Sequence, residues 1–288
     1  MSNFAVKKNS NVEFVNTSDI DLKEKSFKYF AGKMYELAGV NLPVNAKNLA
    51  LVKNRLAKII RTRGMKSYEE LISLLEQNRQ EDINEFISAL TTNKTNFFRE
   101  EAHFEFFNKF LSNFFETHAE LRVWCAASST GQEPYTISLC MNEVLGPNIK
   151  KVKMLATDID LQVLEKAGKG IYNNSEMEGV PHSLRQKYFD IMRSEDTYFR
   201  AKEDLKKPIR FSQFNLVTGK YDFKAPFDII FCRNVLIYFD EQTTRQVIDH
   251  LTDSVQVGGY LILGHSEAGT VRNPRLKTMG RAIYQRIK

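Results

Sequence analysis

The sequence predicts an α/β protein in which a small all-helical N-terminal domain precedes a larger domain built on a parallel sheet. Three observations support this fold class. The length of 288 residues suffices for two domains. Residues 22 to 90 carry apolar side chains at helical spacing, without a strand pattern. From Glu120 onward, short apolar runs alternate with helical segments, which is typical of a doubly wound sheet.

The N-terminal part is expected to hold four helices. The first, in SFKYFAGKMYELAGV, places Phe27 and Phe30 on one face. The second runs through AKNLALVKNRLAKIIRTRGM and stops at Gly64. The third, SYEELISLLEQ, begins with a Ser67–Glu70 capping box, and EDINEFISAL forms the fourth. These helices predict a small bundle.

The larger part has four strong strand candidates, which are LRVWCAA, KVKMLATDID, FDIIFCRNV and GYLILGH. Helical segments such as EPYTISLCMNEVL and EQTTRQVIDHLTDSV separate them, and RAIYQRI is expected as an edge strand. GIYNN, DTYFRA and PIRFSQF are interpreted as small strands around the helix SLRQKYFDI, so residues 168–211 form an inserted subdomain. The expected organisation is a flexible extension over 1–21, a helical domain over 22–92 and the sheet domain over 93–288.

Composition narrows the class of protein. The three cysteines lie inside apolar runs without C-x-x-C spacing, which indicates reduced thiols and a cytoplasmic protein. The five histidines form no ligand pattern in the sequence, so we expect no metal. No signal peptide is expected, and no apolar run approaches the roughly 20 residues that a membrane helix needs. The formal charge of +6 is mild for a nucleic-acid-binding protein.

The first strand is followed by a loop of small residues that includes Ala127 and Gly131. In open α/β sheets, ligands bind outside the carboxyl ends of the strands, and small side chains allow the backbone to approach them. Glu133 begins the next helix. A carboxylate at this position would repel a pyrophosphate and attract an ammonium group, which argues against a dinucleotide.

Polar residues follow the other strands as well. Asp158 ends the second strand, where an acid accepts hydrogen bonds from ribose hydroxyls. Asn215, in FNLVTG, offers an amide suited to an adenine edge, and Asn234 and Tyr238 follow a later strand. A ribose, an adenine and a cationic group without a phosphate cradle together describe S-adenosylmethionine. The alternative to a cofactor-binding protein is a protein with the same nucleotide-binding fold whose site no longer functions.

The chain resembles the CheR-type chemotaxis receptor methyltransferases, whose motifs occur in the same order here from about Phe27 to the C-terminus. The stretches that carry the resemblance are LTTNKTNFFRE, AASSTGQEPYT, ATDID, FSQFNL, FDIIFCRNVLIYFD and GGYLILGHSE. Ser128 and Gln132 stand where the family commonly has Cys and Glu. The resemblance implies a Rossmann-like S-adenosylmethionine-dependent methyltransferase domain with a small antiparallel β-subdomain inserted.

The resemblance also implies an activity. Such enzymes methylate glutamate side chains on receptor cytoplasmic helices, giving γ-methyl esters and S-adenosylhomocysteine. It assigns Arg99 and Tyr238 to the transfer chemistry. The cofactor contacts that it implies, together with those inferred from the loop, are Asn93, Thr95, Arg99, Ala127, Gly131, Glu133, Asp158, Asn215, Leu216, Arg233 and Asn234. Without the motif, Arg99 would be taken for a solvated surface residue and Tyr238 for a packed aromatic.

Between Asn41 and Tyr68 the chain has seven basic residues and no acidic one. Such a helix suits an acidic receptor bundle, and it lacks the interleaved aromatics of a nucleic-acid site. A solvated helix face is the plain alternative. By family resemblance it would bind the chemoreceptor helical bundle through Lys53, Arg55, Lys58, Arg61 and Arg63. We expect a monomer and no nucleic-acid partner.

The inserted subdomain captures a receptor tail pentapeptide in some members of the family, through a glycine-rich loop. The matching stretch here, DIMRSEDTYFRAKEDL, has no glycine, so we predict a pentapeptide-independent enzyme. Two alternatives remain open. One is methylation of a small carboxylic acid or a nucleic-acid base by the same fold. The other is a non-catalytic module that senses S-adenosylmethionine and regulates a partner.

Overall fold

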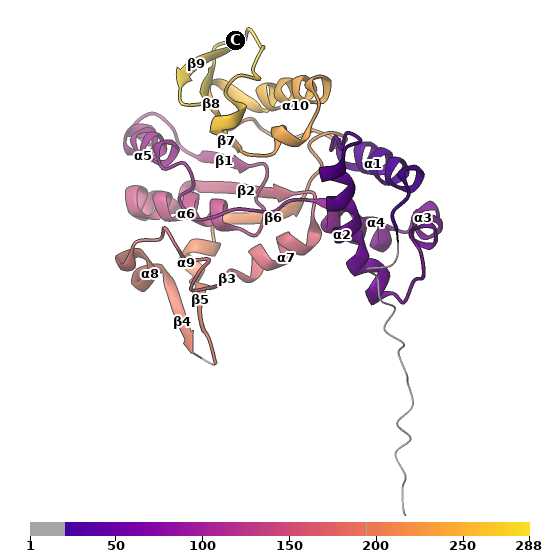
Figure 1. Ribbon diagram of the computed structural model, residues 1–288. Helices are drawn as coiled ribbons and strands as arrows, with labels where there is room; N and C mark the ends of the chain where they lie inside the picture. Colours follow the sequence, from indigo (N-terminus) through magenta and orange to yellow (C-terminus); the bar gives the residue numbers. More distant parts are fainter. Residues whose placement is uncertain (1–20, 194) are drawn as a thin grey trace, which may run out of the picture. The chain divides into compact units, whose positions relative to one another are not determined.

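The computed structural model describes residues 21–193 and 195–288 (Figure 1). Of the predicted extension, residues 1–20 lie outside this description. The chain divides into two compact units. One contains the described residues up to Lys33 together with Leu42–Leu90, and the other contains Met34–Asn41 together with Thr91–Lys288.

The first unit is helical, as predicted, and its core is aromatic. The helices are α1 (Glu24–Ala38, of which the last turn belongs to the second unit), α2 (Ala46–Thr62), α3 (Tyr68–Glu76) and α4 (Gln80–Leu90). Phe30 lies between Tyr68 and Phe86, with ring centroids 6.2 Å and 5.9 Å away. All three rings are buried, and such aromatic contacts stabilise a small core beyond the area that they bury.

Helix starts in this unit follow the sequence signals. Asn45 caps α2 by accepting a hydrogen bond from the amide of Asn48 at 2.8 Å. Ser67 caps α3 by accepting from the amide of Glu70 at 3.3 Å. The capping box is only half formed, because the Glu70 carboxylate accepts from the amide of Lys66 rather than from that of Ser67.

The second unit is built on a seven-stranded mixed sheet of order β6-β2-β1-β7-β8-β10-β9. Its strands are β1 (Leu121–Cys125), β2 (Val152–Asp158), β6 (Ile209–Gln213), β7 (Phe227–Cys232), β8 (Val255–Leu263), β9 (Leu276–Gly280) and β10 (Ile283–Arg286). The first five run parallel, whereas β10 is antiparallel to both β8 and β9. The expectation that RAIYQRI forms the edge is therefore wrong, because β9 pairs with its outer side.

The strands of the inserted subdomain differ from those predicted. A three-stranded antiparallel sheet does form, with order β3-β5-β4. Its strands are β3 (Ile171–Asn173), β4 (Phe189–Arg193) and β5 (Thr197–Ala201). The stretch PIRFSQF does not join it, since β6 pairs in parallel with β2 in the main sheet. Ile209 and Phe211 pack against core residues there, and a short edge strand with polar residues cannot be assigned to one of two sheets by its pattern alone.

Helices cover both faces of the main sheet. Apolar residues of α5 (Ala102–Phe114) and α6 (Gln132–Leu145) share a buried cluster with one face of β1. Those of α10 (Glu241–Ser254) share another with Trp124 on the opposite face. The remaining helical segments are η2 (Gly146–Lys151), α7 (Leu161–Lys169), α8 (His182–Tyr188), α9 (Glu203–Lys206), η3 (Leu236–Tyr238) and η4 (His265–Glu267). Within the described part of the chain, no helix has the length and apolarity needed to cross a membrane.

Candidate cofactor-binding site

The loop between β1 and α6 is tightly built. Gly131 has a φ of +98°, and a Cβ added there would lie 2.6 Å from the Tyr172 hydroxyl oxygen. Only glycine fits this backbone conformation and this space without strain. The Ser128 hydroxyl in the same loop is fully buried, with no hydrogen-bond partner among the described residues. An unpaired buried hydroxyl beside a small-residue turn is consistent with a ligand-binding loop.

Asp158, at the carboxyl end of β2, meets this loop. Its carboxylate accepts hydrogen bonds from the amides of Ser129 at 2.8 Å and Asp160 at 3.1 Å. Burial raises the pKa of Asp158 to about 6, although these amides act in the opposite direction. The structure therefore brings the acid of the second strand against the turn that follows the first, as expected for residues at neighbouring carboxyl ends.

Asp160 is a residue that the sequence analysis did not single out. Its side chain is buried and accepts hydrogen bonds from the Asn93 amide at 2.9 Å and the Thr91 hydroxyl at 3.1 Å. The main-chain oxygen of Asn93 also accepts from the Ser129 hydroxyl at 3.1 Å. The start of the NKTNFFRE motif is thus fixed to the cofactor loop. The signal in the sequence that could have indicated this contact is Asp160 itself, the second acid of ATDID.

The rest of that motif lies along α6 and the end of β7. The amide of Phe98 donates to the Thr136 hydroxyl at 3.2 Å. The Arg233 guanidinium donates to the main-chain oxygen of Arg99, whose own guanidinium donates to the oxygen of Lys94 at 3.1 Å. The side chains of Arg99 and Thr95 are half-buried. The motif is therefore placed beside the loop that was predicted to hold the cofactor.

Arg233 forms the centre of a buried ion cluster. Its guanidinium lies 2.6 Å from the Glu133 carboxylate and 3.1 Å from that of Glu100, with no exposed side-chain area. The Cys125 thiol donates to the other Glu133 oxygen at 3.3 Å. Burial acts to raise the pKa of Glu100, but the charge of Arg233 and a hydrogen bond from Asn234 hold it below its ordinary value. Two carboxylates and one guanidinium leave one net negative charge, which favours a cationic ligand.

Asn234 is held in a left-handed conformation at φ 59°. Its amide donates to Glu267 at 2.9 Å, and its side chain donates to Glu100 at 3.3 Å. Glu267 also accepts from the amide of Leu236 at 2.8 Å, so this buried acid shapes the whole turn that leads to Tyr238. Tyr238 is half-buried on η3. The sequence did not indicate that Glu267 fixes this distant turn, although Glu267 is the last residue of GHSE, one of the stretches that carry the family resemblance.

Asn215 is positioned differently from the expectation. Its side-chain amide donates to the oxygen of Leu37 at 2.7 Å, and its side-chain oxygen accepts from the amide of Val217 at 2.9 Å. Reading an adenine edge with this side chain would require one of these bonds to be exchanged. Leu216 beside it is buried in the core cluster that includes Trp124.

Left-handed backbone gathers around these residues. The non-glycine residues with positive φ at the candidate site are Phe98, Glu100, Ser129 and Asn234, at 53°, 58°, 47° and 59°. Each such conformation costs free energy, and such residues concentrate at ligand sites, where the surrounding structure holds them. Their positions coincide with the loop, the motif and the turn after β7.

Three possible metal ligands also lie near this cluster. They are Glu100, the buried His103 and the exposed His265, and one donor atom of each lies within 4.8 Å of the others. Burial and the nearby Arg233 lower the pKa of His103 to about 4.

The geometry fits a nucleoside cofactor with a cationic end. The Asp158 carboxylate is of the kind that accepts hydrogen bonds from ribose hydroxyls, the cluster around Arg233 is net negative, and the turn at Gly131 permits close backbone approach. The protein is thus of the class of α/β proteins that bind a nucleoside-containing ligand at the carboxyl ends of a parallel sheet.

Comparison with known families makes the assignment specific. The family model described as CheR methyltransferase, SAM binding domain, matches residues 93–284, and the CheR methyltransferase, all-alpha domain, matches residues 25–91. The chain belongs to the CheR methyltransferase family. Its SAM-binding domain confirms the predicted cofactor, and the two matched domains confirm the predicted fold class.

Individual relatives agree over most of their length. The chain is 38% identical over 263 residues to a chemotaxis protein methyltransferase of Borreliella burgdorferi, covering 88% of this chain and 91% of the relative. It is 36% identical to the chemotaxis protein methyltransferase of Salmonella typhimurium, covering 93% and 92%. The Escherichia coli protein of the same description is 34% identical, covering 93% of both.

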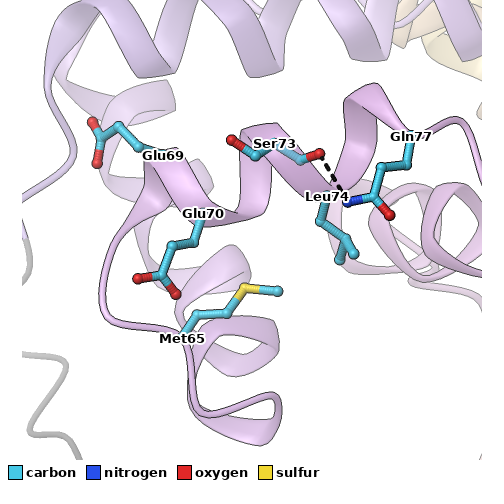
Figure 2. A pocket seen from close by; sticks show the side chains of 6 residues that line it. All are labelled: Met65, Glu69, Glu70, Ser73, Leu74 and Gln77. Carbon is cyan, nitrogen blue, oxygen red and sulfur yellow. Dashed lines mark hydrogen bonds between the residues drawn. The ribbon is translucent and has the colours of Figure 1, made fainter.

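A pocket of different character lies on α3 in the helical unit. Figure 2 shows its lining residues, which are Met65, Glu69, Glu70, Ser73, Leu74 and Gln77. Its charged groups are two carboxylates, one of which accepts from the Ser26 hydroxyl at 2.9 Å. None of the predicted cofactor or receptor-binding residues lines it.

Proposed function

We propose that this protein transfers the methyl group of S-adenosylmethionine to glutamate side chains of chemoreceptors, forming methyl esters during chemotactic adaptation. The observation that most supports this proposal is that Asp158, the NKTNFFRE motif and the Arg233 cluster meet at one end of the sheet. Membership of the CheR family supports the substrate class. We further propose that the protein works in the cytoplasm at receptor arrays, as a monomer.

When bound, S-adenosylmethionine supplies a methyl group on a sulfonium centre for in-line displacement. A substrate glutamate is already ionised at pH 7, so the chain does not need to supply a general base. We assign to Asp158 the ribose hydroxyls and to Glu133 the cofactor ammonium. Arg99 has a guanidinium fork that would orient the substrate carboxylate, and Tyr238 would contact it or the sulfonium region.

The remaining predicted cofactor residues keep supporting roles in this proposal. Asn93 and Thr95 would approach the cofactor from the motif, and Ala127 and Gly131 from the loop. The guanidinium of Arg233 points to Glu133 and Glu100, so we infer that it positions Glu133 rather than contacting the cofactor.

The basic helix α2 divides into engaged and exposed cations. Arg63 lies 2.6 Å from Asp82 and also pairs with Glu85, and Arg55 donates to the oxygen of Leu90 at 2.8 Å. Lys53 lies 3.5 Å from Asp21. Lys58 and Arg61 are exposed, and neither side chain has a hydrogen-bond or ion-pair partner among residues 21–193 and 195–288. We therefore propose these two as the main contacts to an acidic receptor bundle.

We retain the proposal that methylation does not depend on a tail pentapeptide. The β4 and β5 strands pair over their whole length, from Phe189 opposite Ala201 to Arg193 opposite Thr197, and the stretch that joins them lacks glycine. Calorimetric titration of a receptor tail peptide should show no binding at micromolar concentration. Micromolar binding would contradict this part of the proposal.

Two measurements on the full chain test the proposal. Calorimetry should detect binding of S-adenosylhomocysteine, and incubation with labelled S-adenosylmethionine should transfer label to receptor-containing membranes. Asp158→Asn should weaken the first and abolish the second. Tight cofactor binding without any transfer would favour the non-catalytic sensing module, and transfer to nucleic acid or a small acid instead would favour the other alternative.

A further inference from the structure

Three side chains from two segments converge at the ion cluster of the candidate cofactor site. Glu100 precedes α5, His103 lies in its first turn, and His265 begins η4. One donor atom of each lies within 4.8 Å of the other two. The imidazole rings of His103 and His265 have centroids 4.9 Å apart. Sequence spacing does not reveal this group, because more than 160 residues separate Glu100 from His265.

The hydrogen bond of His103 determines which ring nitrogen carries the proton. Its Nε2 lies 2.7 Å from the main-chain oxygen of Arg281. A carbonyl oxygen only accepts, so Nε2 must donate, and in the neutral ring Nδ1 then presents a lone pair. That assignment is inferred from the hydrogen-bond partner, as is usual for histidine.

Another acceptor lies close to Nδ1. His103 has no exposed side-chain area, and Nδ1 has no hydrogen-bond partner among the described residues. The carboxylate oxygen Oε2 of Glu100 lies 3.4 Å from Nδ1. An ionised carboxylate is also an acceptor. Two acceptor atoms this close together, one of them on a fully buried ring, are unfavourable, and a cation that both can bind removes the conflict.

The spacing matches a tetrahedral metal. With bonds of about 2.0–2.2 Å, two ligand atoms of a tetrahedral Zn²⁺ site lie roughly 3.3–3.5 Å apart. The observed 3.4 Å between Nδ1 and Oε2 is within that range. The His265 ring is exposed and can rotate to complete the set, because its main chain is fixed near Glu100 by an amide hydrogen bond of 3.2 Å.

The charged groups around Glu100 have opposite effects on a bound cation. The Arg233 guanidinium is 3.1 Å from Glu100 and would repel a metal. Glu133 pairs with the same guanidinium at 2.6 Å, so the cluster as a whole carries one net negative charge. A bound ion would compete with Arg233 for Glu100, which in turn holds the side chain of Asn234.

We propose that Glu100, His103 and His265 bind a divalent transition-metal ion such as Zn²⁺, with an open position for water. Two imidazoles and one carboxylate form a donor set that selects such ions over Mg²⁺ or Ca²⁺. This site shares Glu100 with the Arg233 cluster, but its argument does not rest on the proposed methyl transfer.

The test is a titration of the full-length, untagged protein with Zn²⁺, followed by calorimetry and by competition with a chromophoric chelator. One Zn²⁺ should bind per chain, and Mg²⁺ should not displace it. Substitution with Co²⁺ should produce the visible absorption of a tetrahedral site. His265→Gln should weaken Zn²⁺ binding by about tenfold or more, and Glu100→Gln should do the same.

Matched controls make the result decisive. His182→Gln changes another exposed histidine, on α8, and should bind Zn²⁺ as the wild type does. An unchanged unfolding transition of His265→Gln shows that the fold is intact. Zn²⁺ binding that is equal in the wild type and His265→Gln, or the absence of stoichiometric binding to the wild type, would overturn the proposal.

Discussion

At the scale of single residues, buried charge controls the candidate site. Asp158 and the cluster of Arg233, Glu133 and Glu100 all lie at carboxyl strand ends or beside them. Asp158 and Glu133 could be predicted from the sequence, because a strand end and a helix start are local signals. Glu100 and Glu267 could not, because their partners lie 133 and 33 residues away and only the fold brings them together.

The raised pKa of Asp158 predicts how cofactor affinity depends on pH. Ribose hydroxyls donate to an ionised carboxylate, and Asp158 is protonated below its pKa of about 6. The affinity for S-adenosylhomocysteine should therefore be constant above that value and fall by roughly tenfold per pH unit below it. Calorimetry between pH 5 and pH 8 measures the profile. Asp158→Asn should bind weakly with a flat profile, and a flat profile in the wild type would contradict the assignment.

Arg233 should be essential to stability because it is the buried cation that pairs with both Glu133 and Glu100. Replacing it by methionine leaves Glu133 and Glu100 uncompensated, which should lower the free energy of unfolding by about 3–5 kcal/mol. Chemical denaturation measures this difference. Arg245→Met breaks an exposed pair with Glu241 and should change the free energy by less than about 0.5 kcal/mol. Equal effects of the two substitutions would refute the role of Arg233.

At the scale of elements, the loop and helix starts follow local rules, whereas strand pairing does not. The turn at Gly131 and the cap at Ser67 have clear sequence signals. The placement of β6 beside β2, and of β9 outside β10, depends on which partner an apolar strand finds. Ile209 and Phe211 are partly buried and pack against both the main core and the cluster beside the small sheet, so a short stretch of sequence cannot specify which sheet the strand joins.

Two glycines provide a matched test of the loop. Gly131→Ala forces a side chain into a position with φ +98° and a contact of 2.6 Å with the Tyr172 hydroxyl. It should destabilise the protein by about 2 kcal/mol or more and weaken S-adenosylhomocysteine binding. Gly168→Ala, in α7, meets no atom within 4 Å and should be neutral or stabilising by up to about 1 kcal/mol. Thermal unfolding compares them, and a neutral Gly131→Ala would contradict this account of the loop.

At the scale of the whole molecule, the chain combines a basic helical unit with a methyltransferase unit. The fold class of both units could be predicted from the sequence, because helical periodicity and strand–helix alternation extend over long stretches. Which basic residues are available was not predictable, since the acidic partners of Arg63 come from α4.

Reversing the charge of the exposed cations should separate the two units functionally. Lys58→Glu with Arg61→Glu should lower receptor methylation by about tenfold, chiefly through slower association at low salt, because attraction to an acidic bundle is lost. Affinity for S-adenosylhomocysteine should be unchanged. Lys109→Glu makes a similar change on exposed surface of α5 and should have little effect. A parallel loss of cofactor affinity in the double variant would contradict a receptor-binding role.

The central claim is methyl transfer to receptor carboxylates, and the stability of the product to base tests it most directly. Receptor-containing membranes are incubated with the protein and labelled S-adenosylmethionine, washed and treated with mild base. Methyl esters hydrolyse under these conditions, whereas N-methyl groups do not. The account predicts that the label is released as methanol, and label that remains on the protein after base treatment would contradict it.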